Sequence, residues 1–374
     1  MKRVGIISYH SGHNYGTMLQ AYALQCAIKK LGIQEVEYIN YVDGKPFREA
    51  SWTVRFQKIK DKLKLGFFQL AYQFLFRKKI MFIAEKYNRF FQDYINTSET
   101  FYSSIEELKK NPPQYDIYIV GSDQTWNPTF LKDNGAYFLC FLDEHYLKNS
   151  YASSLGVYSL TEEQKLLYKE YLKSFRYISC RENVNAVVLS SLLKRKVEHV
   201  LDPTLLLDAD DWRSIEIKCD VPDKYVLCYC LGEKKSVREF ARKLGLRHGL
   251  PVFYIPSNYR DLCYKNVLFN IGPLEFIYLF RHATYICTDS FHGTAFSINF
   301  GKNFYSFYKR KGDVSCGDNS RILHLLKEFS LLNRLKFEEF EEEEDINYKD
   351  SVEQYLKLQR NTSYSFLNQI LFND

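Results

Sequence analysis

Short hydrophobic runs alternate with longer amphipathic stretches along most of the chain. Val4–Tyr9 has the pattern of a buried strand, the apolar stripe from Gly16 to Leu31 predicts a helix, and Val36–Tyr41 predicts the next strand. A strand, a helix and a strand at this spacing form a right-handed crossover, which implies a parallel sheet.

The same alternation continues to the end of the chain, with a polar break at residues 208–223. Before the break, strands are expected at Asp116–Val120, Ser150–Ser154, Tyr177–Cys180 and Val197–Leu201. After it, we expect strands at Tyr225–Leu231, Val252–Ile255, Tyr285–Thr288 and Asn303–Phe307, and helices at Ser236–His248, Pro273–His282 and Asn319–Phe329. The pattern predicts an α/β protein with domains at 1–208 and 224–335 and a cleft between them. Residues 336–374 would form an acidic, solvated linker and a C-terminal helix, 350–372, that packs back on the first domain.

Composition fits a globular protein, with 46% hydrophobic and 26% charged residues among 374. The 30 Tyr and 29 Phe predict cores rich in rings. The net charge of +6 is unevenly placed, because 12 basic and 3 acidic residues lie between Lys45 and Arg89, whereas seven acidic residues lie between Glu338 and Asp345. Residues 45–95 are predicted to be a basic, aromatic and mostly helical insertion.

The nine cysteines include no CxxC pair and no zinc signature, and their odd number indicates free thiols in a reducing compartment. The apolar start of the chain is too short for a signal peptide, and the longest apolar segment, Phe67–Phe76, is far below the ~20 residues that span a bilayer. We therefore expect a cytoplasmic protein that needs no metal and no cofactor.

Two polar motifs follow predicted strands of the first domain. His10–Gly16 leads into the first helix, where Asn14 and Gly16 would form an anion site at the helix N-terminus; the alternative is a plain turn capped by Asn14. Gly121–Asn127 offers Asp123, Gln124 and Trp126 as sugar contacts; the alternative is a capping turn with the tryptophan packed in the core.

Further candidates lie at later strand ends. Arg181 can bind a carboxylate or phosphate, or can pair with an acid such as Glu182. Thr288–Thr294 places Asp289 and His292 close enough for general acid–base chemistry. The basic residues Lys309–Lys311 are either a phosphate contact or a solvated loop.

These motifs together resemble the polysaccharide pyruvyl transferase family. The stretches that carry the resemblance are NYGTMLQAYALQCAIKKLG (14–32), YDIYIVGSDQTWNP (115–128), SYASSLG (150–156), ISCREN (178–183), LDPTLLLD (201–208) and TDSFHGTAFSINFGKNF (288–304). The resemblance spans about residues 1–330 and implies two Rossmann-like domains that face each other across a cleft, in a glycosyltransferase-B-like arrangement.

The resemblance also implies an activity: transfer of pyruvate from phosphoenolpyruvate onto two hydroxyls of a sugar, on a polysaccharide precursor or a lipid-linked oligosaccharide. Arg181 would match an anion-binding arginine, His292 the active-site histidine, and Lys309 or Lys311 a phosphate-binding lysine. Many family members have Arg-Leu-His where this chain has Ser290-Phe291-His292, so one guanidinium of the donor site is replaced by a hydroxyl. Either Asp289 or Ser290 would orient His292.

Two other functions are compatible with the sequence. A glycosyltransferase with a nucleotide-sugar donor would use the same architecture and the same kind of basic groups. A non-catalytic protein that binds anionic surfaces would use the basic aromatic segment, although no nucleic-acid motif accompanies it and we expect no nucleic-acid partner. Phe67, Leu70 and Phe74 share one helical face, which would contact a membrane or acceptor, or else pack on the first domain.

Overall fold

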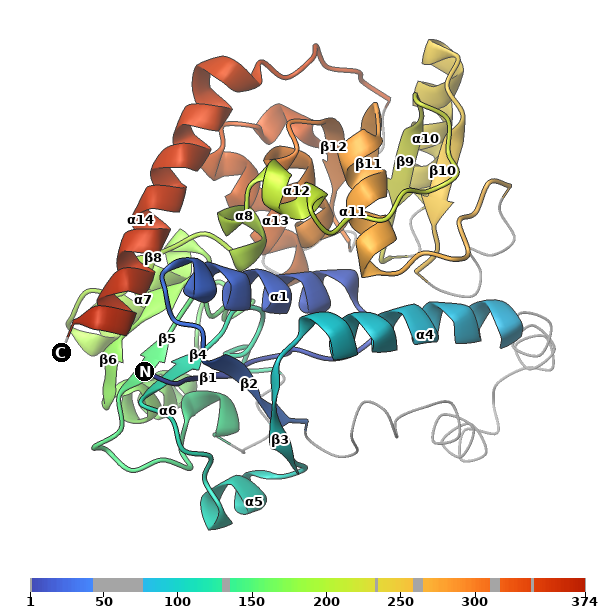
Figure 1. The fold of residues 1–374 in the computed structure, drawn as a ribbon. Helices are drawn as coiled ribbons and strands as arrows, with labels where there is room; N and C mark the ends of the chain where they lie inside the picture. The colour runs from blue at the N-terminus through green and yellow to red at the C-terminus, as the bar shows by residue number, and fades with distance from the viewer. Residues whose placement is uncertain are drawn as a thin grey trace, which may run out of the picture.

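Two parallel sheets, each with helices on both faces, form two Rossmann-like domains in this computed structural model (Figure 1). The structure describes residues 2–42, 77–129, 135–232, 235–257, 265–309, 317–337 and 340–373. The predicted apolar face at Phe67, Leu70 and Phe74 therefore lies outside the described residues, and α4 (Arg77–Tyr94) is the described helix of the expected insertion.

The first sheet has the strand order β3-β2-β1-β4-β5-β6, and all of its pairs are parallel. Its strands are β1 (Val4–Ile7), β2 (Val36–Tyr41), β3 (Thr97–Tyr102), β4 (Ile117–Val120), β5 (Lys148–Ser150) and β6 (Phe175–Tyr177). A separate pair follows, β7 (Ser179–Cys180) and β8 (Glu198–His199). The helices of this domain are α1 (Tyr15–Lys30), α4, α5 (Ile105–Lys110), α6 (Glu162–Leu172) and α7 (Asn183–Leu193).

Alternate residues of a strand point to opposite faces of the sheet, and β4 shows how this builds two cores. Ile117 and Ile119 belong to the core that contains the apolar side of α1. Tyr118 and Val120 belong to the core that contains side chains of α5, α6 and α7. Helices therefore cover both faces, as a buried parallel sheet requires.

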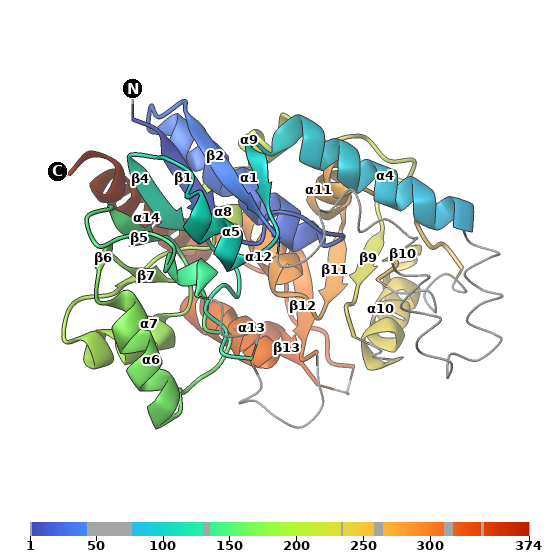
Figure 2. The ribbon, with the colours of Figure 1, turned by 90° about the horizontal axis from the view of Figure 1, so that it is seen from below.

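The second sheet has the order β10-β9-β11-β12-β13 and is also parallel throughout. Its strands are β9 (Val226–Tyr229), β10 (Val252–Ile255), β11 (Tyr285–Thr288), β12 (Asn303–Phe307) and β13 (Leu335–Lys336). One face packs on α10 (Lys235–His248), and the other packs on α11 (Pro273–His282), α12 (Phe291–Asn299) and α13 (Gly317–Glu328). Figure 2 shows that α12 and α13 lie on the side of this sheet that faces the first domain.

The largest hydrophobic core is continuous from one domain to the other. Two short helices lie at the junction, α8 (Pro203–Leu206) and α9 (Ala209–Arg213). Trp212 of α9 is fully buried, and its Nε1 donates to the carbonyl of Thr204 at 3.2 Å. Its ring lies 5.1 Å from that of Phe296 in the second domain and 5.8 Å from that of Tyr22 in the first, between ring centroids. This tryptophan therefore joins the two domains.

The C-terminal helix α14 (Glu353–Phe372) returns to the first domain and the junction (Figure 1). The backbone N–H of Leu201 donates to Ser363 Oγ at 3.0 Å, and Arg360 Nε donates to the carbonyl of Leu205 at 2.7 Å. Arg360 Nη2 also donates to Asn299 Oδ1 of α12 at 2.7 Å. The last helix thus fixes the segment after β8 against the second domain.

The described part of the acidic run is attached to the second domain rather than being a solvated linker, which corrects our expectation. Glu342 pairs with Arg247 at 2.9 Å and with His248 at 2.5 Å, at the C-terminus of α10. Glu343 pairs with Lys336 of β13. The cations in the last turn of α10 therefore attract the Glu342 carboxylate, whereas Glu343 is held by a lysine of the sheet.

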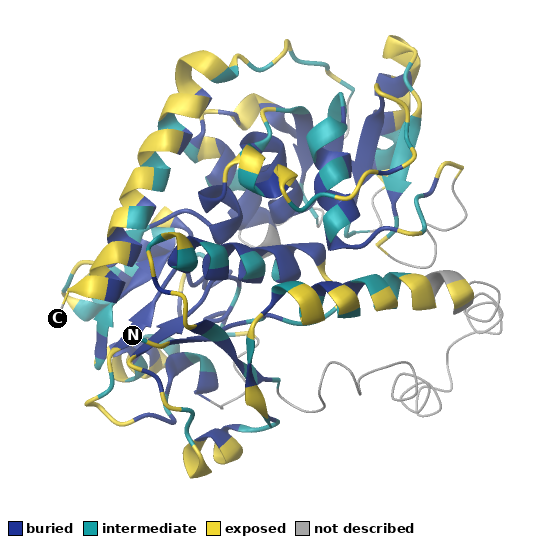
Figure 3. Cartoon of the chain, in the orientation of Figure 1, coloured by how far each residue is buried: buried dark blue, intermediate teal, exposed yellow. Residues whose placement is uncertain are grey.

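Most residues of the central strands are buried, whereas β3 has exposed residues and one side of α4 and one side of α14 are exposed (Figure 3). None of the described helices is both long enough and apolar enough to cross a membrane.

We expect Trp212→Ala to lower the free energy of unfolding by about 3–5 kcal/mol, because it removes a fully buried ring and leaves a cavity between the domains. Urea unfolding followed by circular dichroism measures the change. Leu166→Ala is the control, since that side chain is 71% exposed. A loss below about 1 kcal/mol for the tryptophan variant would contradict the role of Trp212 as the joint.

Candidate functional site

The residues that carry chemistry lie where strands end, at the boundary between the domains. Arg181 directly follows β7, and Asp202 comes shortly after β8. Ser290 and His292 follow β11 and open α12 of the second domain. Ligands of open parallel sheets bind beyond the carboxyl ends of the strands, so this boundary is the place where a site is expected.

Arg181 is a buried cation held by two carboxylates. Its side chain is 2% exposed, Nε donates to Glu182 Oε1 at 3.1 Å, and Nη1 donates to Asp202 Oδ2 at 3.0 Å. Its Cζ lies 4.2 Å from the centroid of the Phe291 ring. Burial by itself lowers the pKa of Arg181, but the charges of Glu182 and Asp202 outweigh it and raise that pKa, so the guanidinium stays protonated.

The remaining nitrogen of Arg181, Nη2, is buried and has no hydrogen-bond partner in the structure. Buried polar groups are nearly always bonded, so this nitrogen is available to a water molecule or to a ligand. Two of the three guanidinium nitrogens already donate to carboxylates, so only one is left for a ligand. The sequence led us to expect that more of the guanidinium would be available.

Asp202 connects Arg181 with His292 and is completely buried. Its Oδ1 accepts from the backbone N–H and the hydroxyl of Thr204, at 3.0 and 2.7 Å, and so begins α8. Its Oδ2 accepts from Ser122 Oγ at 3.0 Å and from Arg181, and lies 3.8 Å from His292 Nε2. Burial raises the pKa of Asp202, but the nearby charges of His292 and Arg181 and the bonds from Thr204 outweigh it, so that the pKa is lowered.

The side chain of His292, from the second domain, packs on α1 of the first domain at Gly16, which has no side chain. A Cβ built on Gly16 would lie 2.0 Å from His292 Nδ1, so the ring fits only because residue 16 has no side chain. On the other side of the ring, Nε2 is buried and lacks a hydrogen-bond partner. Gly16 therefore shapes the site sterically. Its predicted role in binding the donor stays a prediction, as does that of Asn14, whose Oδ1 accepts from the Thr17 N–H and caps α1.

The pKa of His292 is lowered, first by burial and then by the charges of Arg181 and Arg321. Asp202 and Asp123 act in the opposite direction and raise it. Because the net effect is a decrease, the ring is neutral near pH 7 and can accept a proton.

Asp123 and Gln124 lie beside this group. Asp123 has a left-handed backbone with a φ of 75°, and its Oδ2 accepts from Thr17 Oγ1 of α1 at 3.2 Å. A non-glycine residue in this conformation is uncommon and often marks a functional turn. Gln124 Oε1 accepts from Asn127 Nδ2 at 2.6 Å. Acceptor binding by Asp123 and Gln124 stays a prediction.

Trp126 is a core residue, and our expectation that it contacts an acceptor sugar is wrong. The ring is fully buried and stacks on Phe138 with centroids 5.6 Å apart. Its Nε1 donates to the carbonyl of Tyr137 at 2.8 Å. Neither face nor edge is left for a ligand, which is the alternative that the sequence left open.

Asp289 and Ser290 are engaged locally. Asp289 accepts the backbone N–H groups of Leu231 and Gly232, at 2.6 and 3.0 Å, and so ties the loops after β9 and β11 together. Ser290 Oγ accepts from the Gly293 N–H at 3.2 Å and caps α12. The carboxylate beside His292 is instead Asp202 of the other domain, so the predicted catalytic role of Asp289 stays untested by this geometry.

Of the two predicted phosphate-binding lysines, only Lys309 lies among the described residues. Lys309 lies just after β12, and its carbonyl would be 3.0 Å from a Cβ at Gly232, close to the Asp289 loop. Lys311 lies outside the described residues. Phosphate binding by either lysine stays a prediction.

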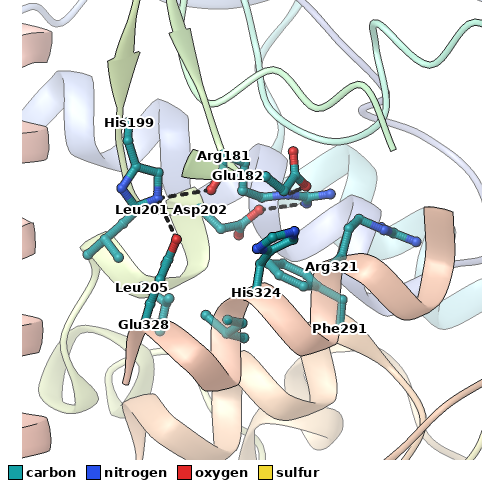
Figure 4. A pocket seen from close by; sticks show the side chains of 11 residues that line it. Arg181, Glu182, His199, Leu201, Asp202, Leu205, Phe291, Arg321, His324 and Glu328 are labelled. Carbon is teal, nitrogen blue, oxygen red and sulfur yellow. Dashed lines mark hydrogen bonds and ion pairs between the residues drawn. The ribbon is translucent and has the colours of Figure 1, made fainter. Parts of the chain in front are cut away.

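A small cavity lies between the domains at this point (Figure 4). It measures about 10 Å³, which is room for about one water molecule, so a larger ligand requires the walls to move apart. The first domain lines it with Arg181, Glu182, His199, Leu201, Asp202 and Leu205, and the second with Phe291, Arg321, His324, Leu325 and Glu328.

Sequence reasoning missed several of these residues. Asp202 stands in the quoted stretch LDPTLLLD directly after a predicted strand, and that position was the available signal. Arg321, His324 and Glu328 follow the i, i+3, i+7 spacing of one helical face, but nothing local in the sequence shows that this face meets the first domain. His199 and Glu328 form a pair at 3.1 Å across the boundary.

The arrangement offers two kinds of chemistry: recognition of an anion by buried guanidinium groups and proton transfer by an imidazole next to a carboxylate. Among the described residues, no group of three or more His, Cys, Asp or Glu side chains is placed to hold a metal ion.

Comparisons with known proteins agree with this description of the chain. A family model described as "Polysaccharide pyruvyl transferase" matches residues 14–308, which is well over half of the sequence. A search of the curated proteins gave no match.

Solved structures with a similar course of the chain include UDP-GlcNAc 2-epimerases and a heptosyltransferase. UDP-GlcNAc 2-epimerase from Methanocaldococcus jannaschii, in complex with UDP-GlcNAc and UDP, has a TM-score of 0.47 and 13% identity, with 97% of this chain and 99% of that chain covered. The epimerase from Neisseria meningitidis bound to UDP-GlcNAc has a TM-score of 0.46 and 11% identity over 100% of both chains. Heptosyltransferase from E. coli with ADP has a TM-score of 0.39 and 12% identity, with 98% and 99% covered. At these scores the likeness carries no argument about function.

We expect Gly16→Ala to destabilise the protein by about 1–3 kcal/mol through overpacking against His292. A loss of stability would be informative, because Gly→Ala in the interior of an ordinary helix stabilises that helix by about 1 kcal/mol. Thermal and urea unfolding measure it, and a double-mutant cycle with His292→Ala identifies the cause. The loss should shrink when the ring is absent; an unchanged loss would place the clash elsewhere.

Proposed function

The chain belongs to the polysaccharide pyruvyl transferase family, and we propose that it transfers pyruvate from phosphoenolpyruvate onto two hydroxyls of a sugar, with His292 as the proton-transfer group and Arg181 as an anion-binding group. The observation that carries the proposal is the pair of buried, unpartnered nitrogens, Arg181 Nη2 and His292 Nε2, beside the interdomain cavity. A phosphorylated carboxylic acid supplies the oxygens that such nitrogens bind.

The reaction balances without a cofactor. Both acceptor oxygens bond to C2 of the enol phosphate, the bond from C2 to the phosphate oxygen breaks, and C3 becomes a methyl group. One hydroxyl proton is needed at C3 and the other leaves with inorganic phosphate. A group that takes a proton from a hydroxyl and delivers one to carbon is therefore sufficient, and a neutral imidazole can do the first task and then the second.

Each residue of the cluster has a part in this proposal. Arg181 is fixed by Glu182 and Asp202 and presents Nη2 to the anionic donor, so little side-chain freedom is lost on binding. His292 is held against Gly16, which restrains its ring for proton transfer. Asp123 accepts from Thr17 Oγ1 and its charge acts on His292, and in this proposal it binds an acceptor hydroxyl.

The assay that tests the function combines phosphoenolpyruvate with sugar acceptors and measures both phosphate release and ketal formation. We expect His292→Ala to lose about 10²–10⁴-fold in rate, the usual contribution of a general acid–base group. Lys327→Ala, an exposed site on α13, is the matched control for folding and handling. Near wild-type turnover by the histidine variant would remove His292 from the mechanism, and turnover of a nucleotide sugar instead of phosphoenolpyruvate would replace the proposed function by the glycosyltransferase alternative.

We further expect Asp202→Asn to shift the pH profile of kcat/KM to lower pH. Asp202 raises the pKa of His292, so removal of its charge lowers that pKa further, and the limb that reports His292 moves with it. The amide keeps an oxygen to cap α8, which limits structural damage. Ser122→Ala is the control, because it removes a neutral donor to the same Oδ2 and leaves the charge in place. If this limb of the pH profile does not move in Asp202→Asn, the carboxylate does not act on His292.

A further inference from the structure

A second and larger cavity lies at the joint between the domains, away from the residues described above. It measures about 340 Å³, whereas the cavity beside Arg181 measures about 10 Å³, and the two share no lining residue. Its walls come from the C-terminal half of α1, from Leu207 after α8 and from α9. Helices α1 and α8 lie side by side (Figure 1). A volume of this size is typical of sites that hold small molecules.

Part of this cavity is apolar. Leu207 is buried, and the half-buried ring of Tyr22 packs against the core that joins the domains, with its centroid 5.8 Å from that of Trp212. The half-buried thiol of Cys26 follows one turn after Tyr22 on the same face of α1. An aromatic or aliphatic group of a ligand would lie against these three side chains.

The charged part of the cavity has an excess of one cation. Lys30 Nζ pairs with Asp211 of α9 at 2.5 Å, so these two charges compensate each other. Lys29 precedes Lys30 in the last turn of α1 and is half-buried. In the part of the chain that the structure describes, no carboxylate forms an ion pair with Lys29. A partly desolvated ammonium favours an anion nearby.

The charge of Lys29 is felt at the thiol of Cys26. Burial raises the pKa of Cys26, whereas a hydrogen bond from Tyr22 and the charges of Lys29 and Lys30 oppose this effect, and the net result is an increase. The thiol is therefore neutral near pH 7 and does not compensate the ammonium of Lys29. The cavity thus combines an apolar wall with one uncompensated positive charge.

Two exposed polar side chains, Gln34 and Ser214, complete the lining. Gln34 Nε2 donates to the carbonyl of Lys29 at 3.4 Å, and Ser214 Oγ donates to the carbonyl of Asp211 at 2.6 Å. Each side chain keeps further hydrogen-bonding capacity, because an amide has two N–H groups and an oxygen, and a hydroxyl oxygen can also accept. A few polar groups beside an apolar wall are the usual composition of a ligand site.

We propose that this cavity is a second ligand site, which takes a small organic anion with an aromatic or aliphatic portion. The acidic group pairs with Lys29, and the apolar portion lies against Tyr22, Cys26 and Leu207. Such a ligand contacts both α1 and α9, the helix that carries Trp212, so its binding stabilises the packing of the joint. The site is independent of the proposed transfer of pyruvate.

The first experiment compares three ring compounds that differ in charge: benzoate, benzamide and benzylammonium. Nuclear magnetic resonance titration of the full-length protein should show benzoate binding about 10-fold more tightly than the other two, because only benzoate pairs with the ammonium of Lys29. Lys29→Ala and Lys29→Gln should both abolish this preference, whereas Lys29→Arg, which keeps the charge, should retain it. Lys169→Ala, an exposed lysine of α6, is the matched control and should bind like the wild type.

The second experiment locates the bound compound through the thiol in the cavity. Benzoate should slow the alkylation of Cys26 by iodoacetamide, measured by mass spectrometry of peptides. Cys140 is the internal control, because it is the other half-buried thiol of the described residues and lies in a different core. Its alkylation rate should stay the same with and without benzoate.

Several results would overturn the proposal. They are absence of benzoate binding, equal binding of all three compounds, or a benzoate preference that survives in Lys29→Ala and Lys29→Gln. Binding that leaves the alkylation of Cys26 unchanged would place the anion elsewhere on the protein. Circular dichroism and thermal unfolding separate a binding defect from misfolding, and a variant that loses stability but keeps the preference for benzoate would give Lys29 a purely structural role.

Discussion

A single carboxylate oxygen, Oδ2 of Asp202, organises the cleft. It accepts from Arg181 and Ser122 and lies 3.8 Å from His292, while the other oxygen of the same group begins α8. A guanidinium buried at 2% exposure is costly unless it is paired, and breaking such a pair typically costs about 3–5 kcal/mol. Asp202 Oδ2 thus pairs with the buried guanidinium of Arg181, and the same carboxylate raises the pKa of His292. Arg181 cannot change its position without changing the electrostatic environment of His292.

The site exists only when the domains meet, because its members come from both. Arg181 and Asp202 belong to the first domain, whereas His292 and the α13 face belong to the second. The fit depends on a close approach in which His292 packs on Gly16 of α1, and on a shared core in which Trp212 contacts rings from both sides. Because Asp202 and His292 belong to different domains, the 3.8 Å between them depends on how the two domains pack on each other.

Elements with clear local periodicity were predictable from the sequence, and features set by distant partners were not. Pro273–His282, Tyr285–Thr288 and Asn303–Phe307 have the bounds that their apolar patterns predict. Strand β3 was missed because its residues alternate weakly and include exposed polar ones. Trp126 was misassigned because a ring after a polar turn looks the same in sequence whether it is buried or not. Asp202 escaped notice because its partner His292 is in the other domain.

Ser290 and Phe291 have separate structural roles at the start of α12. An arginine at 290 would start α12 without the hydroxyl that now accepts from Gly293, so serine gives the helix a better cap. The Phe291 ring lies 4.2 Å from Arg181 Cζ and 5.9 Å from Arg321 Cζ, measured from its centroid, and its negative face attracts both cations. An aliphatic residue at 291 would offer these cations no such face. A ring of the second domain thus stabilises the buried guanidinium of Arg181 in the first, in addition to the carboxylates of Glu182 and Asp202.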